Sequence, residues 1–564
     1  MATKDGSEAA LKTNPNNWHR WKNLLPDVGA GLLLCAFLVP AGMAYSTASG
    51  LPPVAGLYAS IVSLIIYGLL GPSRVLILGP DSALAPLIAA AVVPLSGGDP
   101  HRALALAGLL AIFVGVYLVL GYFLKLGFLS NLLSKPIRTG YLAGLAVVVG
   151  LSQLAGLLGR SSDGVTEPWN QLTSAIGRVA RGDFNMIAAL IGGITIVILL
   201  VATRLPTNLR LLGILVTVGG SMVASAVFGL NEMLPVVGAL PSGLPAPALS
   251  GFSWGDVIAT AGPAAGIALL AFADTAVLSR SLAQRNGVRV DGGKEMLALG
   301  SANAASGVLG GFPISASTSR TPVALNAGAR SRLAGLAAGL WLLVFMLTLP
   351  GVTAHLPSSV LSGVVIVAAA SMVDIDGIKG LIRSSRIETA LMAGTFVGVL
   401  VLGVLPGVVL AVVLSLAVFV QATFSPYRTE LVKVAGRPGF HDITRHPEGR
   451  RIPGLALVRF DSPLFFANGQ VFVDHVRDIV DASPQPVRCV IVAAEGITGV
   501  DSTAVEHLVQ LDEYLEKKGI SLVFAELKGP VKDRLAKFGL ADRFDRGHHF
   551  STVESAVEHF SGQS

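Results

Sequence analysis

One arginine stands in an otherwise apolar segment of this chain, close to several hydroxyl side chains. Arg320 lies between two glycines at 310–311 and a proline at 322, and four hydroxyl residues precede it: Ser315, Ser317, Thr318 and Ser319. A guanidinium at membrane depth costs roughly 2.5–3.5 kcal/mol on insertion scales, so such a residue is kept where it meets an anion, a carboxylate or water. The glycines and prolines argue against a continuous helix here. An interrupted helix with one cation and several hydroxyls predicts an anion-binding site.

The composition indicates a membrane protein. Hydrophobic residues make up 52% of the 564 residues and charged residues 13%, with a mean hydropathy of +0.67. Soluble proteins carry about 25% charged residues. Apolar stretches of roughly 17–25 residues recur, each long enough to cross ~30 Å of hydrocarbon. They predict fourteen transmembrane segments: 27–47, 53–71, 76–94, 103–123, 139–158, 186–204, 211–229, 255–279, 294–310, 314–329, 333–350, 358–374, 388–404 and 406–424.

Basic residues cluster in alternate loops between these segments. With the amino terminus inside, most of the lysines and arginines fall in cytoplasmic loops, as the positive-inside rule requires. An even count then places both termini in the cytoplasm, and we predict a multi-pass protein of the inner membrane, embedded in lipid. Residues 1–26 are polar and predict a cytoplasmic tail with no cleaved signal peptide. The pI of about 9.3 comes largely from the inner loops, so we interpret it as topology and expect no nucleic-acid partner.

The composition changes after Phe424, where apolar runs shorten and charges return. Short apolar runs predict buried strands at 455–460, 489–492 and 521–525. Helical patterns alternate with them at 469–482, 502–518, 529–538 and 552–560. Strands alternating with helices predict a small soluble α/β domain. The predicted domains are a cytoplasmic tail at 1–26, a transmembrane domain at 27–424, and a cytoplasmic linker with a soluble domain at 425–564.

Two segments of the predicted membrane part resemble each other. Residues 78–86 and residues 310–322 each combine glycine, proline and hydroxyl residues before a short apolar run. Aligning their prolines sets Ser82 against Thr318. Transporters built from inverted repeats place broken helices at a shared midplane site, where helix amino termini and free N–H groups favour an anion. The hydroxyls and Asp81 also fit ordinary helix capping, and we expect them to serve both roles.

Four motifs occur in order along the chain. They are residues 39–45 (Val-Pro-Ala-Gly-Met-Ala-Tyr), 50–58, 79–82 and 311–321. Together with a carboxy-terminal region that looks like a STAS domain, they resemble the sulfate permease (SulP) family of anion transporters, whose animal relatives include prestin and pendrin. The resemblance implies a seven-plus-seven inverted repeat, with a core domain from segments 1–4 and 8–11 and a gate domain from segments 5–7 and 12–14. It also implies a homodimer and transport by a core that moves against the gate.

The resemblance assigns substrate-binding residues as well. The anion pocket of the family falls on Ser317, Ser319 and Arg320 with Thr318 beside them, on Ser82 and Ala83, and on the first-segment motif that holds Ala41 and Tyr45. The family usually has glutamine where Ala41 stands, so one polar group of the pocket is missing. This departure bears on which anion is bound more than on transport itself.

Asp274 is the second charge within an apolar segment, and it aligns with a glutamate of the family. Three roles are open to it: an ion-pair partner of Arg320, a group that carries a proton, or a ligand of sodium. Sodium-coupled bicarbonate carriers of the family have a second carboxylate one helical turn later, where this chain has Leu278, so sodium is disfavoured. We predict proton coupling at Asp274 ahead of a purely structural ion pair. No cofactor is expected besides the coupling proton.

Residues 499–504 of the soluble domain resemble the STAS loop whose serine is phosphorylated in anti-sigma-factor antagonists. Ser502 is therefore a candidate regulatory residue. The alternative is a helix start with Asp501 or Ser502 as the cap, and we favour this interpretation. STAS domains on transporters mostly act as folding, dimer or docking modules, so a cytoplasmic protein partner is a further candidate. No metal-ligand set is expected.

The sequence shows no P-loop, no zinc-ligand helix and no nucleophile with its base, so we expect neither an enzyme nor an ATP-driven pump. It predicts a secondary active transporter of a small inorganic or carboxylic anion, with sulfate as the first substrate and protons as the coupling ion. Bicarbonate and C4-dicarboxylates are rival substrates, and an anion channel or exchanger is the rival mode of action. A nucleobase transporter is disfavoured, because such transporters generally bind their substrate through carboxylates, whereas this chain has Arg320 at the predicted site.

Overall fold

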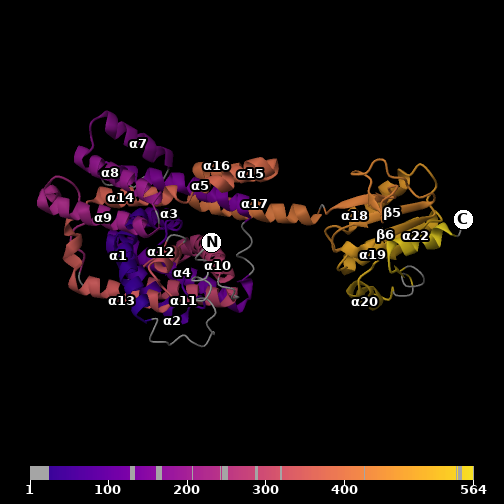
Figure 1. The fold of residues 1–564 in the computed structure, drawn as a ribbon, viewed down its shortest axis with the longest axis horizontal. Helices are drawn as coiled ribbons and strands as arrows, with labels where there is room; N and C mark the ends of the chain where they lie inside the picture. The colour runs from indigo at the N-terminus through magenta and orange to yellow at the C-terminus, as the bar shows by residue number, and fades with distance from the viewer. Residues whose placement is uncertain are drawn as a thin grey trace, which may run out of the picture. The chain divides into compact units, whose positions relative to one another are not determined.

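The computed structural model describes residues 24–127, 134–160, 168–205, 207–241, 243, 252–285, 290–317, 320–424, 426–540, 543 and 549–562. The chain separates into two compact units, with the boundary between Ser415 and Leu416. The first unit is helical and the second is a sheet flanked by helices (Figure 1). We call them the membrane unit and the carboxy-terminal unit.

The membrane unit consists of helices and two very short strands. Its first half contains α1 (Leu24–Ala48), α2 (Pro53–Leu70), β1 (Leu78–Gly79), α3 (Ala85–Ser96), α4 (Pro100–Phe123), α5 (Lys135–Ser152), α6 (Leu154–Leu157), α7 (Pro168–Ala180), α8 (Met186–Thr203), α9 (Thr207–Val227) and η3 (Leu230–Glu232). Its second half contains α10 (Trp254–Arg285), α11 (Gly292–Val308), β2 (Ser315–Ala316), α12 (Arg320–Asn326), α13 (Leu333–Thr348), η4 (Pro350–His355), α14 (Ser358–Ala370), α15 (Ile375–Ser384), α16 (Arg386–Leu402) and α17 (Val404–Phe424), which crosses the boundary between the units.

Many of these helices can cross a membrane. In the described ranges, eight are long and apolar enough to do so, and three shorter apolar helices accompany them at 85–96, 213–227 and 333–348. The multi-pass helical membrane architecture is therefore clear, while the count of fourteen segments stays a prediction. Two helices, α7 and α15, fall between the predicted segments and are amphipathic.

The two segments that were predicted to interrupt helices do so. β1 pairs antiparallel with β2, with Gly79 opposite Ser315. After these strands, α3 begins at Ala85 and α12 begins at Arg320. The predicted third and tenth segments thus each combine an extended stretch with a short helix, as their glycines and prolines indicated. We call the place where β1 and β2 pair the crossing.

The helices of the membrane unit pack into two bundles. In the first, α1 packs against α2 and α13, and α4 packs against α10 and α11. In the second, α5 packs against α14 and α16, and α8 packs against α9 and α14. The first bundle therefore comprises α1–α4 and α10–α13, and the second comprises α5–α9 and α14–α16. Apart from α17, which corresponds to the fourteenth predicted segment, this is the grouping into core and gate that the resemblance implies.

Glycines let helices of the first bundle approach closely. A Cβ on Gly56 of α2 would lie 1.9 Å from the carbonyl oxygen of Gly42 on α1. Similarly, a Cβ on Gly108 of α4 would lie 2.8 Å from the carbonyl oxygen of Gly307 on α11. Helices in lipid associate through such small residues, because lipid tails are as apolar as the side chains they would replace. Part of the glycine content of the chain therefore serves helix packing.

The carboxy-terminal unit holds a mixed sheet whose strand order, in the described residues, is β4-β3-β5-β6-β7-β8. Strands β5 to β8 are parallel, and β3 is antiparallel to both of its neighbours. The strands are β3 (Arg428–Val432), β4 (His441–Asp442), β5 (Leu455–Phe460), β6 (Cys489–Ala493), β7 (Ser521–Ala525) and β8 (His549–Phe550). The main helices are α18 (Gly469–Asp481), α19 (Ser502–Lys517), α20 (Gly529–Lys537) and α22 (Val553–Ser561).

The three strands and four helices predicted for this unit are confirmed, and the sheet separates two apolar clusters. One cluster contains Phe472, Leu508 and Leu535 from α18, α19 and α20, and the other contains Val553 and Ala556 from α22. The antiparallel edge of β3 and β4 was not predicted. β3 mixes charged with apolar residues and β4 consists only of His441 and Asp442, so both strands lack the apolar run that marks a buried strand.

Candidate functional site

Arg320, the first residue of α12, is 1% exposed and lies at the crossing. Its Nη1 donates a hydrogen bond to the carbonyl of Pro80. Its Nη2 donates to the carbonyls of Gly79 at 3.1 Å and Ser315 at 3.4 Å. The guanidinium therefore joins the two interrupted segments. Its Nε is buried and has no hydrogen-bond partner among the described residues, which leaves one donor for a ligand.

Asp81 supplies the carboxylate that faces this arginine. Asp81 Oδ1 lies 3.7 Å from Arg320 Nη2, and both side chains are buried. Asp81 Oδ2 also accepts a hydrogen bond from the N–H of Ala83 at 3.3 Å, and the backbone carbonyl of Asp81 accepts the N–H of Ala85 at 3.1 Å. Asp81 therefore both shapes the entry to α3 and partly neutralises Arg320. The helix cap of α3 is Leu84 and no described side chain bonds to the first turn, so the prediction that Asp81 caps this helix is wrong.

Asp274 pairs with a different arginine. Arg138 Nη2 lies 2.9 Å from Asp274 Oδ1. The hypothesis that Asp274 is the ion-pair partner of Arg320 is therefore wrong. Arg138 lies in the first turn of α5 and Asp274 lies on α10, so this ion pair joins the second bundle to the first. Thr275, the next residue along α10, accepts a hydrogen bond from the N–H of Ala316 at 3.2 Å, which places Asp274 beside the crossing.

The first-segment motif also reaches the crossing. Ala41 and Tyr45 lie one turn apart on α1 and are 3% and 6% exposed. Tyr45 lies close enough to Asp81 and Arg320 for their charges to act on its hydroxyl. No polar group extends from position 41, because alanine stands there. The α1 face toward the site is therefore apolar apart from the Tyr45 hydroxyl.

The remaining predicted substrate-binding residues lie on the interrupted segments. Ser82 is half-buried and Ala83 is buried in the turn before α3. Ser317 is 5% exposed, and its side chain hydrogen-bonds to the Asp81 carboxylate. Thr318 and Ser319 lie outside the described residues. The structure therefore brings Ser82, Ala83, Ser317 and Arg320 together with Ala41 and Tyr45.

Sequence analysis missed the polar side chains that hold the crossing in shape. Asn303 of α11 accepts a hydrogen bond from the N–H of Ile314 at 2.9 Å and donates one to its carbonyl at 3.1 Å. Thr321 Oγ1 accepts the N–H of Ile77 at 3.2 Å. These bonds satisfy extended backbone that would otherwise be unpaired inside a membrane. The only sequence signal was a polar residue in an apolar span, and many such residues bond to their own helix instead.

A further buried carboxylate, Glu295 of α11, was also missed. It is 0% exposed and accepts hydrogen bonds from the hydroxyls of Tyr67, at 2.7 Å, and Ser73. The three residues join α11 to α2 and to the turn after α2. Because both partners are neutral donors within the first bundle, Glu295 fits a structural role there.

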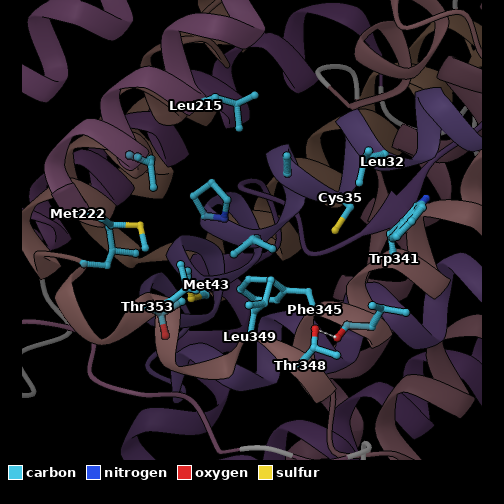
Figure 2. A pocket seen from close by; sticks show the side chains of 18 residues that line it. Leu32, Cys35, Met43, Leu215, Met222, Trp341, Phe345, Thr348, Leu349 and Thr353 are labelled. Atoms are coloured by element: carbon cyan, nitrogen blue, oxygen red, sulfur yellow. Dashed lines mark hydrogen bonds between the residues drawn. The ribbon is translucent and has the colours of Figure 1, made fainter.

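An apolar cavity of about 410 Å³ lies on the face of α1 that points away from Tyr45. Figure 2 shows that Leu32, Cys35 and Met43 line it together with side chains of α9, α13 and η4. The hydroxyl of Thr348, at its edge, donates to the carbonyl of Val344 at 2.7 Å. None of the described residues that line the cavity is charged, so it does not suit an anion.

A second cavity, of about 510 Å³, lies between the bundles and extends along α3 as far as Pro86. It is lined by α3 from Pro86 to Pro94, by Val148, Ser152 and Gln153 near the end of α5, and by the turn around Gly403. Pro86 belongs to the first turn of α3, directly after the turn that holds Ser82 and Ala83. We call this cavity the vestibule. Its lining is mainly apolar, with polar side chains at Thr47, Ser152, Gln153 and Gln171.

Ser502 begins α19 in the carboxy-terminal unit and is exposed. The preceding residue, Asp501, is the helix cap, because its Oδ1 accepts the N–H of Ala504 at 2.8 Å. The capping interpretation is therefore confirmed for Asp501, while phosphorylation of Ser502 stays a prediction.

Comparison with known proteins agrees with both units. Residues 24–395 match the sulfate permease family, and residues 446–556 match the STAS domain. The chain is 37% identical over 544 residues to a probable sulfate transporter of Mycobacterium tuberculosis, covering 96% of each chain. It is 27% identical to the chloroplastic sulfate transporter 4.1 of Arabidopsis thaliana, covering 96% of this chain and 81% of that protein.

Solved structures show the same fold. The murine anion transporter Slc26a9 in its inward-facing state superposes with a TM-score of 0.86 at 22% identity, covering 97% of this chain and 93% of that one. The transmembrane domain of the cyanobacterial bicarbonate transporter BicA gives a TM-score of 0.60 at 23% identity, covering 70% of this chain and 98% of that one.

Two bundles around a pair of interrupted helices, with a soluble sheet domain at the carboxy terminus, define a multi-pass helical membrane transporter with a STAS domain. The chain belongs to the sulfate permease family.

Proposed function

We propose that this protein is a secondary active transporter of a small anion, with sulfate as the first substrate and protons as the coupling ion. The observation that carries the proposal is a guanidinium, that of Arg320, 1% exposed at the crossing of two interrupted helices. A charge at this depth needs an electrostatic reason to be there. The relatives named as sulfate transporters support sulfate as the substrate.

The anion is held by charge more than by a pair of helix dipoles. The described part of α12 spans only seven residues, so its dipole adds little to the charge of Arg320 itself. α3 is longer, at twelve residues, and its first turn lies at the end of the vestibule. An anion that enters by the vestibule therefore meets the amino terminus of α3 first and then Arg320. Ser82, Ser317 and Tyr45 add hydroxyl donors, and Thr318 and Ser319 are proposed to do the same.

Asp81 regulates how strongly Arg320 attracts that anion. The carboxylate lies 3.7 Å from the guanidinium and hence competes with substrate for it. A site with an uncompensated buried arginine would bind an anion tightly and release it slowly. A competing carboxylate keeps affinity moderate, which suits a carrier that must release its substrate on the other side.

Proton coupling is proposed at Asp274, beside the crossing. An anion bound at Arg320 adds negative charge near the carboxylates of Asp81 and Asp274. Protonation of Asp274 removes one of these negative charges and so lowers the repulsion. Anion and proton then favour each other's binding, as linkage requires. Leu278 stands where a second carboxylate would help to hold sodium, which supports the proton.

The cellular arrangement belongs to the same proposal. Both termini are placed in the cytoplasm, with fourteen segments at 27–424 in the inner membrane and the STAS domain within 425–564. The protein is proposed to work as a homodimer in which the first bundle moves against the second. The STAS domain is proposed to support folding or to bind a cytoplasmic partner, and no metal or nucleic acid is required.

The test is uptake into proteoliposomes that contain the purified protein. Sulfate, bicarbonate and succinate are compared as labelled substrates and as competitors, with and without an inward proton gradient. We expect saturable sulfate uptake that the gradient accelerates, together with counterflow, which a channel does not show. Arg320→Lys should keep partial uptake because it keeps the charge without the planar fork. Arg445→Ala, at a side chain that is 78% exposed in the carboxy-terminal unit, is the matched control and should transport normally.

Each outcome separates the candidates. Bicarbonate or succinate uptake without sulfate uptake would replace the substrate and keep the mechanism. Conductance without counterflow would make the protein a channel. Sodium-dependent uptake that ignores pH would overturn proton coupling.

A further inference from the structure

We propose that Arg138 and Asp274 form a latch between the two bundles, which opens when Asp274 takes up a proton. The ion pair would then be the device through which protonation permits the first bundle to move against the second. This inference rests on the proposed proton coupling and adds the residue, Arg138, through which that proton acts.

The ion pair lies at the boundary between the two bundles, which also contact each other where α1 packs against α14 and α9. Asp274 lies on α10, which packs against α3, α4 and α11, and Arg138 lies on α5, which packs against α14 and α16. Their side chains are 11% and 26% exposed, and the nitrogen–oxygen distance of 2.9 Å is that of a charge-assisted hydrogen bond. Because one partner lies in each bundle, the pair acts on the boundary between the bundles.

The pair and the vestibule lie at opposite ends of α5. Val148, Ser152 and Gln153 near the carboxyl end of α5 line the vestibule, while Arg138 is in the first turn. Ten residues from Arg138 to Val148 correspond to about 15 Å along a helix axis. In this structure the vestibule therefore separates the bundles at the carboxyl end of α5, and the ion pair joins them at its amino end. A carrier that opens to each side in turn needs such an asymmetry.

Charge explains why a proton would open the latch. If the bundles parted with both groups ionised, a carboxylate and a guanidinium would lose their partners in a low-dielectric environment. A proton from water, bound to the Asp274 carboxylate, leaves a neutral acid and removes the attraction to Arg138. The same proton returns to water after the movement, so the chain itself is unchanged over a cycle.

Tyr141 offers the neutral acid a second partner. It lies three residues after Arg138 on α5 and close enough to Asp274 to interact with its charge. Its hydroxyl is buried and has no hydrogen-bond partner in the part of the chain that the structure describes. A protonated Asp274 can donate to this hydroxyl as the carboxyl group moves along α5. The groups that act on Asp274 are therefore Arg138 and Tyr141 from α5 and Asp81 from the turn before α3.

The first experiment is a double-mutant cycle in proteoliposomes with equal pH on both sides. Sulfate exchange is measured across a pH series for wild type, Arg138→Gln, Asp274→Asn and the double variant. We expect wild-type exchange to rise as pH falls, and each single variant to lose that pH dependence because either change opens the latch. The double variant should match the single variants, since coupled residues are not additive. Arg138→Lys should restore the pH dependence.

The control is Lys135→Gln, which removes the same charge from the same turn of α5 at an exposed side chain. It should keep the wild-type pH profile. Retention of that profile by Arg138→Gln, or multiplication of the two single effects in the double variant, overturns the latch. Absence of anion exchange by the wild type would instead overturn the proposed function.

A second measurement does not depend on transport. A cysteine introduced at Ser152 in the vestibule is labelled with a membrane-impermeant thiol reagent, which the buried native Cys35 and Cys489 resist. Opening the latch by Arg138→Gln should slow the labelling, because the bundles can then close the vestibule. Tyr141→Phe, which leaves the ion pair intact, should label like wild type at neutral pH. Equal labelling rates with and without Arg138 count against the proposal even if that variant transports poorly.

Discussion

Replacing Arg320 by alanine should damage the protein in two separable ways, and a second substitution should repair only one of them. The alanine variant removes the guanidinium that lies 3.7 Å from Asp81 and that binds the carbonyls of Gly79, Pro80 and Ser315. Sequence alone predicts only a loss of anion binding. The contacts add a loss of stability, because Asp81 is left buried without the cation that faces it.

The magnitudes differ enough to be measured. Removing one partner of a buried ion pair costs about 3–5 kcal/mol. In Arg320→Ala combined with Asp81→Asn, no stranded carboxylate remains, and the asparagine oxygen can still accept the N–H of Ala83. The residual cost is then about 1–3 kcal/mol for carbonyls that lose their donor. Anion affinity should fall in both variants, since a unit charge about 4 Å from Arg320 gains roughly 4 kcal/mol at an effective dielectric constant of 20, close to a thousandfold in affinity.

Two assays on the same preparations test this. Stability is followed as the fraction of folded protein that survives heating, measured by size-exclusion chromatography, and sulfate binding is followed by equilibrium binding to the purified protein. Arg320→Ala should be heat-labile and should not bind, and the double variant should recover most of the heat resistance but no binding. A double variant as labile as the single one would refute the role of Asp81. Wild-type affinity in either variant would refute Arg320 as the anion-binding cation.

Other substitutions test helix packing and the carboxy-terminal unit. Gly56→Ala should lower the free energy of unfolding by about 1–3 kcal/mol, because its Cβ would lie 1.9 Å from the Gly42 carbonyl oxygen. Gly262→Ala is the control and should leave stability unchanged, since its Cβ would meet no described atom within 4 Å. Equal heat inactivation of the two variants would contradict the packing argument. Burial opposes ionisation of Asp442, but hydroxyl donors outweigh it and hold the pKa of this carboxyl below its usual range. Its ionised form therefore stabilises the folded unit above the unfolded-state pKa of about 3.9, and that stability is lost as pH falls through the lower folded-state pKa. Asp442→Asn should remove this stability at neutral pH and flatten the acid dependence of hydrogen exchange in β3 and β4, and an unchanged acid profile would count against it. Truncation after Pro426 should lower yield or transport rate in proteoliposomes without changing which anions compete, and altered selectivity at matched expression would place part of the site in the carboxy-terminal unit.

The architecture followed from local properties of the sequence. Apolar length marked the membrane unit, and the return of charge after Phe424 marked the soluble one. The interruptions before α3 and α12 were predictable because glycine and proline act on their own backbone, whatever packs around them. The edge strands β3 and β4 were not predictable, because the pairing of β3 with β5 and of β4 with β3 compensates for a weak apolar pattern, and pairing is a tertiary property.

The charges of the site were found by sequence, but their partners were not. Arg320 and Asp274 stood out as ionised groups in apolar segments, and the simplest hypothesis paired them. In the structure Arg320 instead donates to the backbone carbonyl of Gly79, 241 residues away in sequence. Asp274 pairs with Arg138, 136 residues away. A residue type and its spacing determine what a side chain can bind. Which partner it meets depends on how α3, α5, α10 and α12 pack, since an ion pair forms only where packing brings two groups within a few ångströms and leaves too little water to screen them.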